Sequence, residues 1–354
     1  MKKILIVGSE GYIGSSLLSY LSKNKNYKIT TLDTGYFRDG IIKKNLKNKL
    51  NYNLDIRRFN SKKIKNFDTV ICLAGQQNDP GNFSKKKFYE ITKKYTLQLA
   101  KYCKRYGVKF IFPSSCSIYG YSTTFVNEKS KPKPLTYYSK SKIEIEKELI
   151  KISDKKFFPI ILRFSTIFGF SNAIRMDLLI NMICAMAVYH KNIILNSNGR
   201  SWRPYLHVDF ACRAIKLCVD KTFNINDPKV YNVGFNNYNY KTIEVAKLVK
   251  KVSKAKIIFE LNSDKANVIA DKAVKDGVDK RSYRVKFDLF NKKFPNFYKN
   301  NNLKKDISIL FKKIKKIKND NKNLISDYRF FRLQKMEKLI KNKHVNGDLY
   351  WIKK

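Results

Sequence analysis

The first fourteen residues constrain the fold of this 354-residue chain more than any later stretch does. Residues 3–7 end in four consecutive apolar side chains, which is typical of a strand buried on both faces of a parallel sheet. Gly8, Gly11 and Gly14 follow at once, and the next residues carry apolar side chains at helical spacing. Glycines in such a turn let the backbone approach a pyrophosphate, while the positive end of the helix faces its charge. These residues therefore predict a dinucleotide-binding turn.

An acidic residue after the next predicted strand indicates which dinucleotide would bind. Residues 28–32 form that strand, and Asp33 follows it, 19 residues after Gly14. A carboxylate at this place accepts hydrogen bonds from the adenosine ribose hydroxyls and repels a 2′-phosphate. The sequence therefore favours NAD over NADP. The alternative is an ordinary strand-to-helix turn followed by a chance aspartate.

Strands and helices alternate through the first half of the chain. Further strands are predicted at residues 69–73, 108–112 and 158–163, and helices at residues 86–105 and 138–152. Because parallel strands in this order need right-handed helical crossovers, we expect an α/β fold with a Rossmann-type doubly wound parallel sheet.

The pattern becomes irregular after residue 170, although residues 230–233 predict a late return to the sheet. We expect an NAD-binding Rossmann domain over residues 1–170, with returning segments near 205–240, and a smaller C-terminal substrate-binding lobe over residues 171–354. The lysine-rich tail of that lobe keeps a helical period and is expected to dock as a helix. The apolar residues of this period are Ile307, Leu310, Phe311 and Ile314.

The net charge of +46, taken alone, suggests a partner rich in phosphate, such as nucleic acid or an anionic membrane. The kind of basic residue argues otherwise, because 61 of the 74 are lysines scattered along the chain and 13 are arginines. Proteins that read nucleic acid favour arginine, whose planar fork grips phosphates and bases. We therefore interpret the lysines as a solvated surface and predict neither nucleic acid nor membrane as a partner. Attraction of an anionic substrate is the alternative.

The cysteines and histidines predict neither a metal site nor a disulfide framework. The six cysteines occur without Cys-x-x-Cys spacing, and His190 and His344 are isolated. The stretch before Gly8 is too short for the apolar core of a signal peptide, and no run is long enough to span a bilayer. We expect a cytoplasmic protein with reduced thiols and no metal.

Tyr138 and Lys142 are four residues apart in a predicted helix, which places both side chains on one face. A nearby ammonium and a positively charged nicotinamide favour the phenolate of Tyr138. The phenolate could then take a proton from a substrate hydroxyl. A hydroxyl of residues 114–119, which follow the strand at residues 108–112, could share that hydrogen bond. Chance is the alternative, since the chain is rich in tyrosine and lysine.

In their order and spacing, these motifs resemble the extended short-chain dehydrogenase/reductases that act on nucleotide sugars. The resemblance covers nearly the whole chain. The residues that carry it are Gly8, Gly11, Gly14, Asp33, Asp55, Ile56, residues 73–75 and 114–120, Tyr138, Lys142, Leu162, Arg163, and residues 203–209, 231–234 and 281–285.

The resemblance implies a bound NAD, a nucleotide-sugar substrate and, as is common among relatives, a homodimer. The residues implied to bind NAD are Gly8, Gly11, Tyr12, Ile13, Gly14, Asp33, Asp55, Ile56, Leu73, Ala74, Gly75, Tyr138, Lys142 and Ser165. The residues implied to be catalytic are Ser115, Tyr138 and Lys142. The residues implied to contact the substrate are Ser115, Asn181, Arg203 and Arg281.

Departures from the family pattern narrow the reaction that the resemblance implies. The 4,6-dehydratases of the family carry Asp-Glu directly after the catalytic serine or threonine, where this chain has Cys116 and Ser117. The pattern is most similar to that of a UDP-galactose-type 4-epimerase, in which an NDP-hexose passes through a transient 4-keto sugar while NAD is reduced and reoxidised. A dehydratase, dehydrogenase or reductase of the same fold is one alternative. A basic binding protein without catalysis is the other.

Some residues near these motifs receive a structural interpretation. Cys116 is expected to serve packing, because a 3,5-epimerase of this fold has its catalytic cysteine one residue later. His207 and Asp209 are expected to pack or to cap a helix. Thr92 replaces an asparagine that many relatives have near the nicotinamide, so the retention of NAD between turnovers is less firmly implied.

Overall fold

Seven parallel strands form the main sheet in the computed structural model, which describes residues 1–42, 50–75, 85–260, 274–275, 278–299, 301–320 and 323–352. Their order is β11-β7-β5-β4-β1-β2-β3. The strands are β1 (Lys2–Val7), β2 (Tyr27–Asp33), β3 (Tyr52–Asn53), β4 (Thr69–Cys72), β5 (Lys109–Ser115), β7 (Ile160–Phe164) and β11 (Val230–Val233). The order reverses beside β1, where α/β sheets of this kind bind nucleotides at the carboxyl ends of the strands. The predicted doubly wound Rossmann-type sheet is confirmed.

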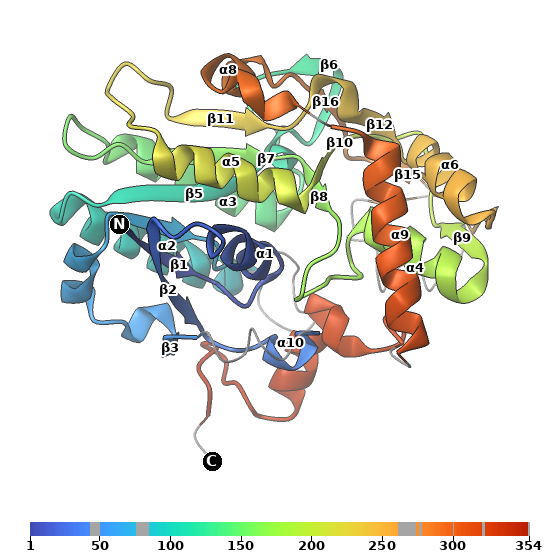
Figure 1. The fold of residues 1–354 in the computed structure, drawn as a ribbon, viewed down its shortest axis with the longest axis horizontal. Helices are drawn as coiled ribbons and strands as arrows, with labels where there is room; N and C mark the ends of the chain where they lie inside the picture. Colours follow the sequence, from blue (N-terminus) through green and yellow to red (C-terminus); the bar gives the residue numbers. More distant parts are fainter. Residues whose placement is uncertain are drawn as a thin grey trace.

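Two pairs of helices cover the two faces of this sheet (Figure 1). The pairs are α1 (Tyr12–Leu21) with α5 (Val208–Asp220), and α2 (Lys85–Arg105) with α3 (Tyr137–Lys151). Strand β1 needs apolar residues without alternation because it contacts both layers. Ile4 and Ile6 join the core that includes α1 and α5, whereas Leu5 and Val7 join the core that includes α2 and α3.

A smaller lobe follows at the right of Figure 1, where α4, α6 and α9 contact one another in pairs. The remaining α-helices are α4 (Leu179–His190), α6 (Thr242–Ser253), α8 (Asp288–Lys293), α9 (Leu303–Asn319) and α10 (Arg332–Lys341). Helix α9 is the docked tail helix that the period predicts, since Ile307, Leu310 and Ile314 are fully buried. Helix α4 follows the irregular stretch after residue 170 and was not predicted. None of the helices among the described residues is long and apolar enough to cross a membrane.

Short strands and 3-10 helices connect these layers. The strands outside the main sheet are β6 (Tyr121–Val126), β8 (Thr166–Phe168), β9 (Asn192–Leu195), β10 (Trp202–His207), β12 (Asn239–Lys241), β13 (Lys256–Phe259), β14 (Val274–Lys275), β15 (Val278–Asp279) and β16 (Ser282–Val285). The 3-10 helices are η1 (Arg38–Gly40), η3 (Ile56–Arg58), η4 (Ser61–Asn66), η5 (Cys116–Tyr119), η6 (Asn236–Tyr238), η7 (Pro295–Tyr298) and η8 (Tyr328–Phe330). Strand β8 pairs with β10, and β16 pairs with β6, so segments distant in sequence meet beside the carboxyl end of β5.

The last segment of the chain leaves the lobe and returns to the β2 and β3 edge of the sheet, in red at the bottom of Figure 1. The apolar face of α10 contributes Met336 and Leu339 to a small core around Tyr36. Trp351 Nε1 donates a hydrogen bond to the Thr34 carbonyl at 2.6 Å. In the C-terminal helical tail, α9 therefore packs in the lobe, whereas the apolar face of α10 is buried against the sheet domain.

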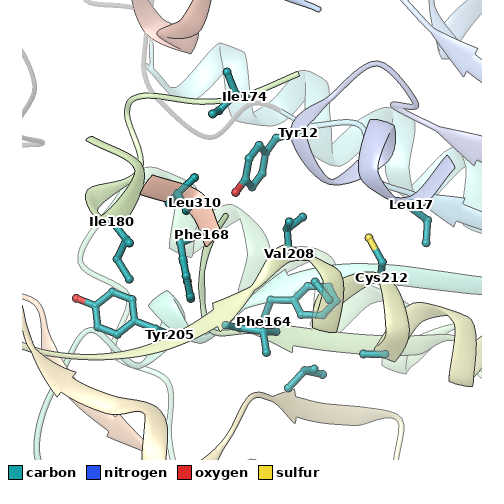
Figure 2. Packing of buried hydrophobic residues seen from close by; sticks show 14 of the residues in the cluster. Tyr12, Leu17, Phe164, Phe168, Ile174, Ile180, Tyr205, Val208, Cys212 and Leu310 are labelled. Atoms are coloured by element: carbon teal, nitrogen blue, oxygen red, sulfur yellow. The ribbon is translucent and has the colours of Figure 1, made fainter. Parts of the chain in front are cut away.

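One buried cluster joins the sheet domain to the lobe, and part of it is shown in Figure 2. Val208 at the start of α5 belongs to the sheet domain, whereas Ile180 and Leu310 come from helices α4 and α9 of the lobe. Tyr12 of α1 also points into this cluster, and its hydroxyl donates to the Gly169 carbonyl at 2.6 Å. The chain that follows β8 is thereby held against the glycine turn.

Candidate active site

Two adjoining cavities open at the carboxyl ends of β1, β4 and β5. The first extends from the glycine turn to Ser115 and Tyr138, and the second extends from the same turn to Asp33 and Asp55. The residues that border both cavities are Gly8, Gly11, Phe37, Leu73 and Gly75. The two cavities therefore form a continuous site across the switch point of the sheet.

The glycine turn has no room for side chains at two positions. Gly8 has a φ of +87°, and a Cβ on it would lie 2.6 Å from the backbone nitrogen of Ala74. A Cβ on Gly14 would lie 2.1 Å from the Gly8 carbonyl oxygen, so α1 begins directly against the turn. The first amides of α1 have no acceptor within the helix, and Tyr12 and Ile13 border the cavity, as an anion site requires. The Tyr12 ring points into the core instead (Figure 2).

Substituting Gly14 by alanine is expected to weaken NAD binding at least about tenfold, because the new methyl group must push the Gly8 carbonyl out of the turn. Titration of the apoprotein with NAD measures the effect. Gly107→Ala is the control, because a Cβ on Gly107, whose φ is +65°, would meet no atom within 4 Å. That variant should lose some stability and keep its NAD affinity. Equal affinities for Gly14→Ala and wild type would show that the turn tolerates a side chain.

Asp33 is held at the end of β2 by two backbone amides. Its carboxylate accepts hydrogen bonds from Glu10 N at 2.9 Å and from Gly35 N at 2.8 Å. Burial raises the pKa of Asp33, and these two amides counteract that rise. Asp55 borders the same cavity, with its carboxylate bound to Arg57 Nη2 at 2.5 Å. Acidic oxygens therefore surround the place where a ribose would fit and a 2′-phosphate would be repelled.

A capping box formed by Thr136 and Ser139 fixes the start of helix α3 at Tyr137. Thr136 Oγ1 accepts a hydrogen bond from Ser139 N, and Ser139 Oγ accepts one from Thr136 N, both at 3.1 Å. This start places Tyr138 in the first turn of the helix and Lys142 one turn later on the same side. Both residues border the first cavity, as their spacing predicts.

Ser115, Tyr138 and Lys142 meet beside the end of β5. The Tyr138 hydroxyl and Ser115 are hydrogen-bonded. Lys142 Nζ donates to the Pro113 carbonyl at 2.8 Å and lies 5.6 Å from the centroid of the Tyr138 ring. The structure therefore assembles a hydroxyl, a phenol and an ammonium in one cavity, which is the arrangement needed to move a proton to or from a substrate oxygen.

Burial controls the protonation of this group. It raises the pKa of Tyr138 to about 12, although the hydrogen bond with Ser115 and the charge of Arg175 both lower it. Burial also lowers the pKa of Lys142 to about 8. In the protein alone, desolvation of the phenolate outweighs the effects of Ser115 and Arg175 and favours the neutral phenol. The expected phenolate depends on the positively charged nicotinamide as well as on Lys142.

Lys142→Met is expected to stabilise the folded protein at pH 7 by about 1 kcal/mol. Below about pH 8, Lys142 is charged in the folded and in the unfolded protein, so burial of the charge lowers the free energy of unfolding by its full amount. Between that pH and 10.5, the ordinary pKa, the folded lysine is neutral, and the cost disappears. Methionine removes the charge but leaves the Pro113 carbonyl without its donor, which reduces the gain. Urea unfolding of the wild type and of Lys142→Met at pH 7 and pH 10 measures the gain in free energy of unfolding. A gain that increases with pH would show that burial of the lysine charge does not cause it.

The cavities contain nearly all of the residues that the sequence assigns to the site. Every residue implied to bind NAD borders one of the two cavities, and Ser115 and Arg281 border the first. Asn181 does not border them. It is 0% exposed, and its amide accepts a hydrogen bond from Gly169 N and donates one to the Arg175 carbonyl, each at 2.9 Å. It supports the cavity wall from behind.

Arg203 also lies behind the cavity lining in the structure. Its guanidinium is buried and donates hydrogen bonds to the carbonyls of Trp202 and Arg281, and it lies 5.4 Å from the centroid of the Tyr283 ring. The guanidinium of Arg203 thus links β10 to the residue before β16. Arg281 itself borders the cavity. A direct contact of Arg203 with the substrate stays a prediction.

Comparison with known proteins identifies the family. The model of the NAD dependent epimerase/dehydratase family matches residues 4–234. The chain belongs to this family. The dTDP-D-glucose 4,6-dehydratase of Dictyostelium discoideum is 30% identical over 281 residues, which are 72% of this chain and 62% of that protein. The chain therefore spans less than two thirds of the length of this relative.

Solved structures share the fold. An NAD-dependent NDP-hexosamine 5,6-dehydratase, TunA, has a TM-score of 0.73 at 18% identity, over 88% of this chain and 97% of its own. The UDP-glucuronic acid 4-epimerase of Bacillus cereus, in complex with UDP-glucuronic acid and NAD, has a TM-score of 0.71 at 22% identity, over 89% and 99%.

NAD, the cofactor of this epimerase/dehydratase family, fits the observed site. A side chain at Gly8 or Gly14 would fill the turn that borders both cavities, so the backbone there is open to a diphosphate. Gly8, Gly11 and Gly14 with the start of α1 would hold the diphosphate, and Asp33 the adenosine ribose. Among the residues that the structure describes, no cluster of acidic, cysteine or histidine side chains could hold a metal ion.

Two residues with an ambiguous sequence signal have structural roles. Cys116 is fully buried, and its Sγ donates to the Arg163 carbonyl at 3.1 Å. Burial raises the pKa of the Cys116 thiol well above its usual value, so it packs as expected. His207 caps α5, and its Nδ1 accepts a hydrogen bond from Asp209 N at 3.3 Å.

Several residues of the site were not predicted from the sequence. The first cavity is also bordered by Phe37, Ser117, Arg175, Asp177 and Arg332, and the second by Leu349. Arg175 Nη2 and Asp177 Oδ2 form a buried ion pair of 2.7 Å beside the cavity. The choice of arginine could have indicated Arg175 and Arg332, because only 13 of the 74 basic residues of the chain are arginines. Where lysine is the default, an arginine marks a place where a planar, bidentate donor is needed.

Proposed function

We propose that this family member is an NAD-dependent nucleotide-sugar epimerase that inverts C4 of an NDP-hexose through a transient 4-keto sugar. Ser115, Tyr138 and Lys142 border the cavity beside the glycine turn, which supports oxidation and reduction at a sugar carbon. Support for epimerisation over dehydration comes from the acids of this cavity. Elimination of water from the keto sugar needs a group that can protonate the departing hydroxyl.

Among the described residues that border the first cavity, Asp177 is the only one with a carboxyl group. Burial raises the pKa of Asp177, but the adjacent Arg175 outweighs burial and leaves that pKa below its usual value. Asp177 is therefore ionised at neutral pH and cannot act as the acid. Cys116 and Ser117 occupy the positions where a dehydratase of this family has Asp and Glu. This lack of an available carboxylic acid among the described residues that border the cavity is the observation that carries the proposal.

In the proposed reaction, the proton of the sugar 4-hydroxyl passes to the Tyr138 oxygen while the C4–H bond breaks and a C4 carbonyl forms. Ser115 would hold the sugar oxygen by a hydrogen bond, and the Lys142 ammonium, 5.6 Å from the centroid of the Tyr138 ring, would favour the charged form of Tyr138. NAD, when bound, supplies the hydride acceptor and donor. After the keto sugar turns its other face, Tyr138 returns the proton to the 4-oxygen. Tyr138 thus ends each turnover as it began.

A dehydratase is the second candidate, favoured by the 30% identity to the Dictyostelium enzyme. Incubation of the full chain and NAD with UDP-, dTDP-, CDP- and GDP-hexoses, followed by NMR and mass spectrometry, separates the two. A 4-epimerase gives a product of unchanged mass with an inverted C4, and Tyr138→Phe forms none. A product lighter by one water would establish the dehydratase. Stoichiometric NADH would establish a net oxidation, and no conversion of any sugar would refute the proposal.

A further inference from the structure

Arg332 is a buried cation at the cofactor end of the first cavity. It is the first residue of α10, is 7% exposed, and borders the same cavity as Gly11 and Gly14. Its guanidinium carbon lies 3.8 Å from the centroid of the Phe37 ring, and Phe37 borders both cavities. Nη2 donates to the Ala173 carbonyl at 3.4 Å. The guanidinium is thus held between Phe37 and the Ala173 carbonyl, in the wall of the cavity that also contains the glycine turn.

The charge of Arg332 lacks the kind of partner that other buried arginines have. Arg163 is paired with Glu146 at 2.6 Å, and Arg175 with Asp177 at 2.7 Å. Among the residues that the structure describes, no carboxylate forms an ion pair with Arg332. Burial lowers the pKa of Arg332, and the neighbouring Arg175 lowers it further. A buried charge in this state is costly unless an anion completes the site.

The segment that carries Arg332 is held by hydrogen bonds before, within and after α10. Met176 N donates to the Phe330 carbonyl at 3.0 Å, and Lys335 Nζ to Asp39 Oδ2 at 2.6 Å. Nearer the end of the chain, Arg57 Nη1 donates to the Asp348 carbonyl at 2.7 Å. These contacts hold residues 328–352 across the edge of the sheet, outside residues 4–234 that the family model matches.

Leu349 of the same segment borders the second cavity together with Asp33 and Ile56. It is buried, and its carbonyl accepts hydrogen bonds from the Tyr36 hydroxyl and from Arg57 Nη2, the latter at 3.2 Å. One segment therefore places a cation beside the diphosphate end of the site and an apolar side chain beside the adenosine end.

We propose that Arg332 binds a diphosphate, that of NAD, and that residues 328–352 form the outer wall of the cofactor site. A diphosphate could also belong to the nucleotide sugar, but Arg332 stacks on Phe37, which borders both the first cavity and the second cavity with Asp33. A planar guanidinium suits the paired oxygens of a diphosphate. The proposal rests on the NAD dependence of the family and is independent of the reaction at C4.

Calorimetric titration of NAD-free, full-length protein tests the cation. Arg332→Met keeps an apolar stem over Phe37 and removes the charge, and Arg332→Lys keeps the charge without the fork. We expect Arg332→Met to weaken binding of NAD and of ADP-ribose at least tenfold, and Arg332→Lys to show a smaller loss. Adenosine, which has no phosphate, and UDP should bind all variants as they bind wild type. Lys341→Met is the matched control on the exposed side of α10 and should change nothing.

Each other outcome overturns a part of the proposal. Unchanged NAD affinity in Arg332→Met would exclude the diphosphate contact, and a loss confined to UDP would assign Arg332 to the nucleotide sugar. A loss shared by adenosine would indicate a distorted fold, which the free energy of unfolding of Arg332→Lys checks. To test the outer wall, Leu349→Ala should weaken the binding of adenosine and of NAD severalfold and leave the binding of UDP unaffected. Gly347→Ala, whose Cβ meets no atom within 4 Å, is the control there.

Discussion

Tyr138→Phe is expected to lower turnover of the nucleotide sugar by about 10²–10⁴-fold and to leave NAD binding nearly unchanged. The substitution removes only the hydroxyl that is hydrogen-bonded to Ser115, and the half-buried ring keeps its place on α3. That hydroxyl is the group proposed to take the proton from the sugar and to return it. Initial rates with saturating NAD, together with calorimetric NAD affinities of both proteins, measure the two effects separately.

The adjacent tyrosine provides a matched control. Tyr137 is 47% exposed and borders neither cavity, and the residue four positions later is Ser141. Tyr137→Phe should therefore keep wild-type turnover. If Tyr138→Phe turned over at the wild-type rate, the acid–base role of Tyr138 would be excluded. A parallel loss of NAD affinity would instead mean that the hydroxyl positions the cofactor.

The part of the site nearest the glycine turn could be predicted because its determinants are local. The spacing from Gly8 to Gly14 and the position of Asp33 after β2 depend on a strand, a turn and a helix that are contiguous in sequence. The four-residue spacing of Tyr138 and Lys142 likewise needs only one helix. Strand order then brings Ser115 to both of them, because consecutive crossovers in such a fold follow a single hand.

The remainder of the site depends on docking that short sequence patterns do not encode. Arg332 and Leu349 reach the cavities only because α10 buries Met336 and Leu339 against Tyr36, roughly three hundred positions earlier in the chain. Asn181 lies on a helix that the irregular stretch after residue 170 concealed, and its amide is directed to backbone groups behind the cavity. The resemblance names Asn181 but neither Arg332 nor Leu349, and only packing decides which atoms face the ligand.

The pKa values of the site could not be predicted from residue spacing either, because they too depend on packing. Tyr138 and Lys142 were expected to influence each other, yet burial moves both pKa values more than their mutual contact does. Desolvation depends on every side chain that excludes water from the cavity, and those come from both domains. One such contribution comes from Glu146, one turn after Lys142 on α3, which raises the pKa of Lys142 against the effect of burial.

Glu146→Ala is expected to destabilise the protein by about 3–5 kcal/mol. Glu146 is 1% exposed, lies 2.6 Å from Arg163 Nη2, and accepts a hydrogen bond from the Ser114 hydroxyl. Removing Glu146 leaves the Arg163 guanidinium buried without the carboxylate of its ion pair. The remaining hydrogen bond, from Arg163 Nη1 to the Tyr119 hydroxyl at 2.9 Å, does not neutralise its charge, because that hydroxyl is neutral. Urea unfolding at pH 7 measures the loss.

A paired substitution separates this charge effect from the loss of packing. In Glu146→Leu with Arg163→Leu no buried charge remains, so most of the stability lost in Glu146→Ala should return. Glu144→Ala on the same helix removes an exposed pair with Lys93 at 2.7 Å and should have a much smaller effect. Because Ser114 adjoins Ser115, turnover of the paired variant should still fall even where stability recovers. A paired variant as unstable as Glu146→Ala would mean that Glu146 acts through its hydrogen bonds and packing, and not by neutralising Arg163.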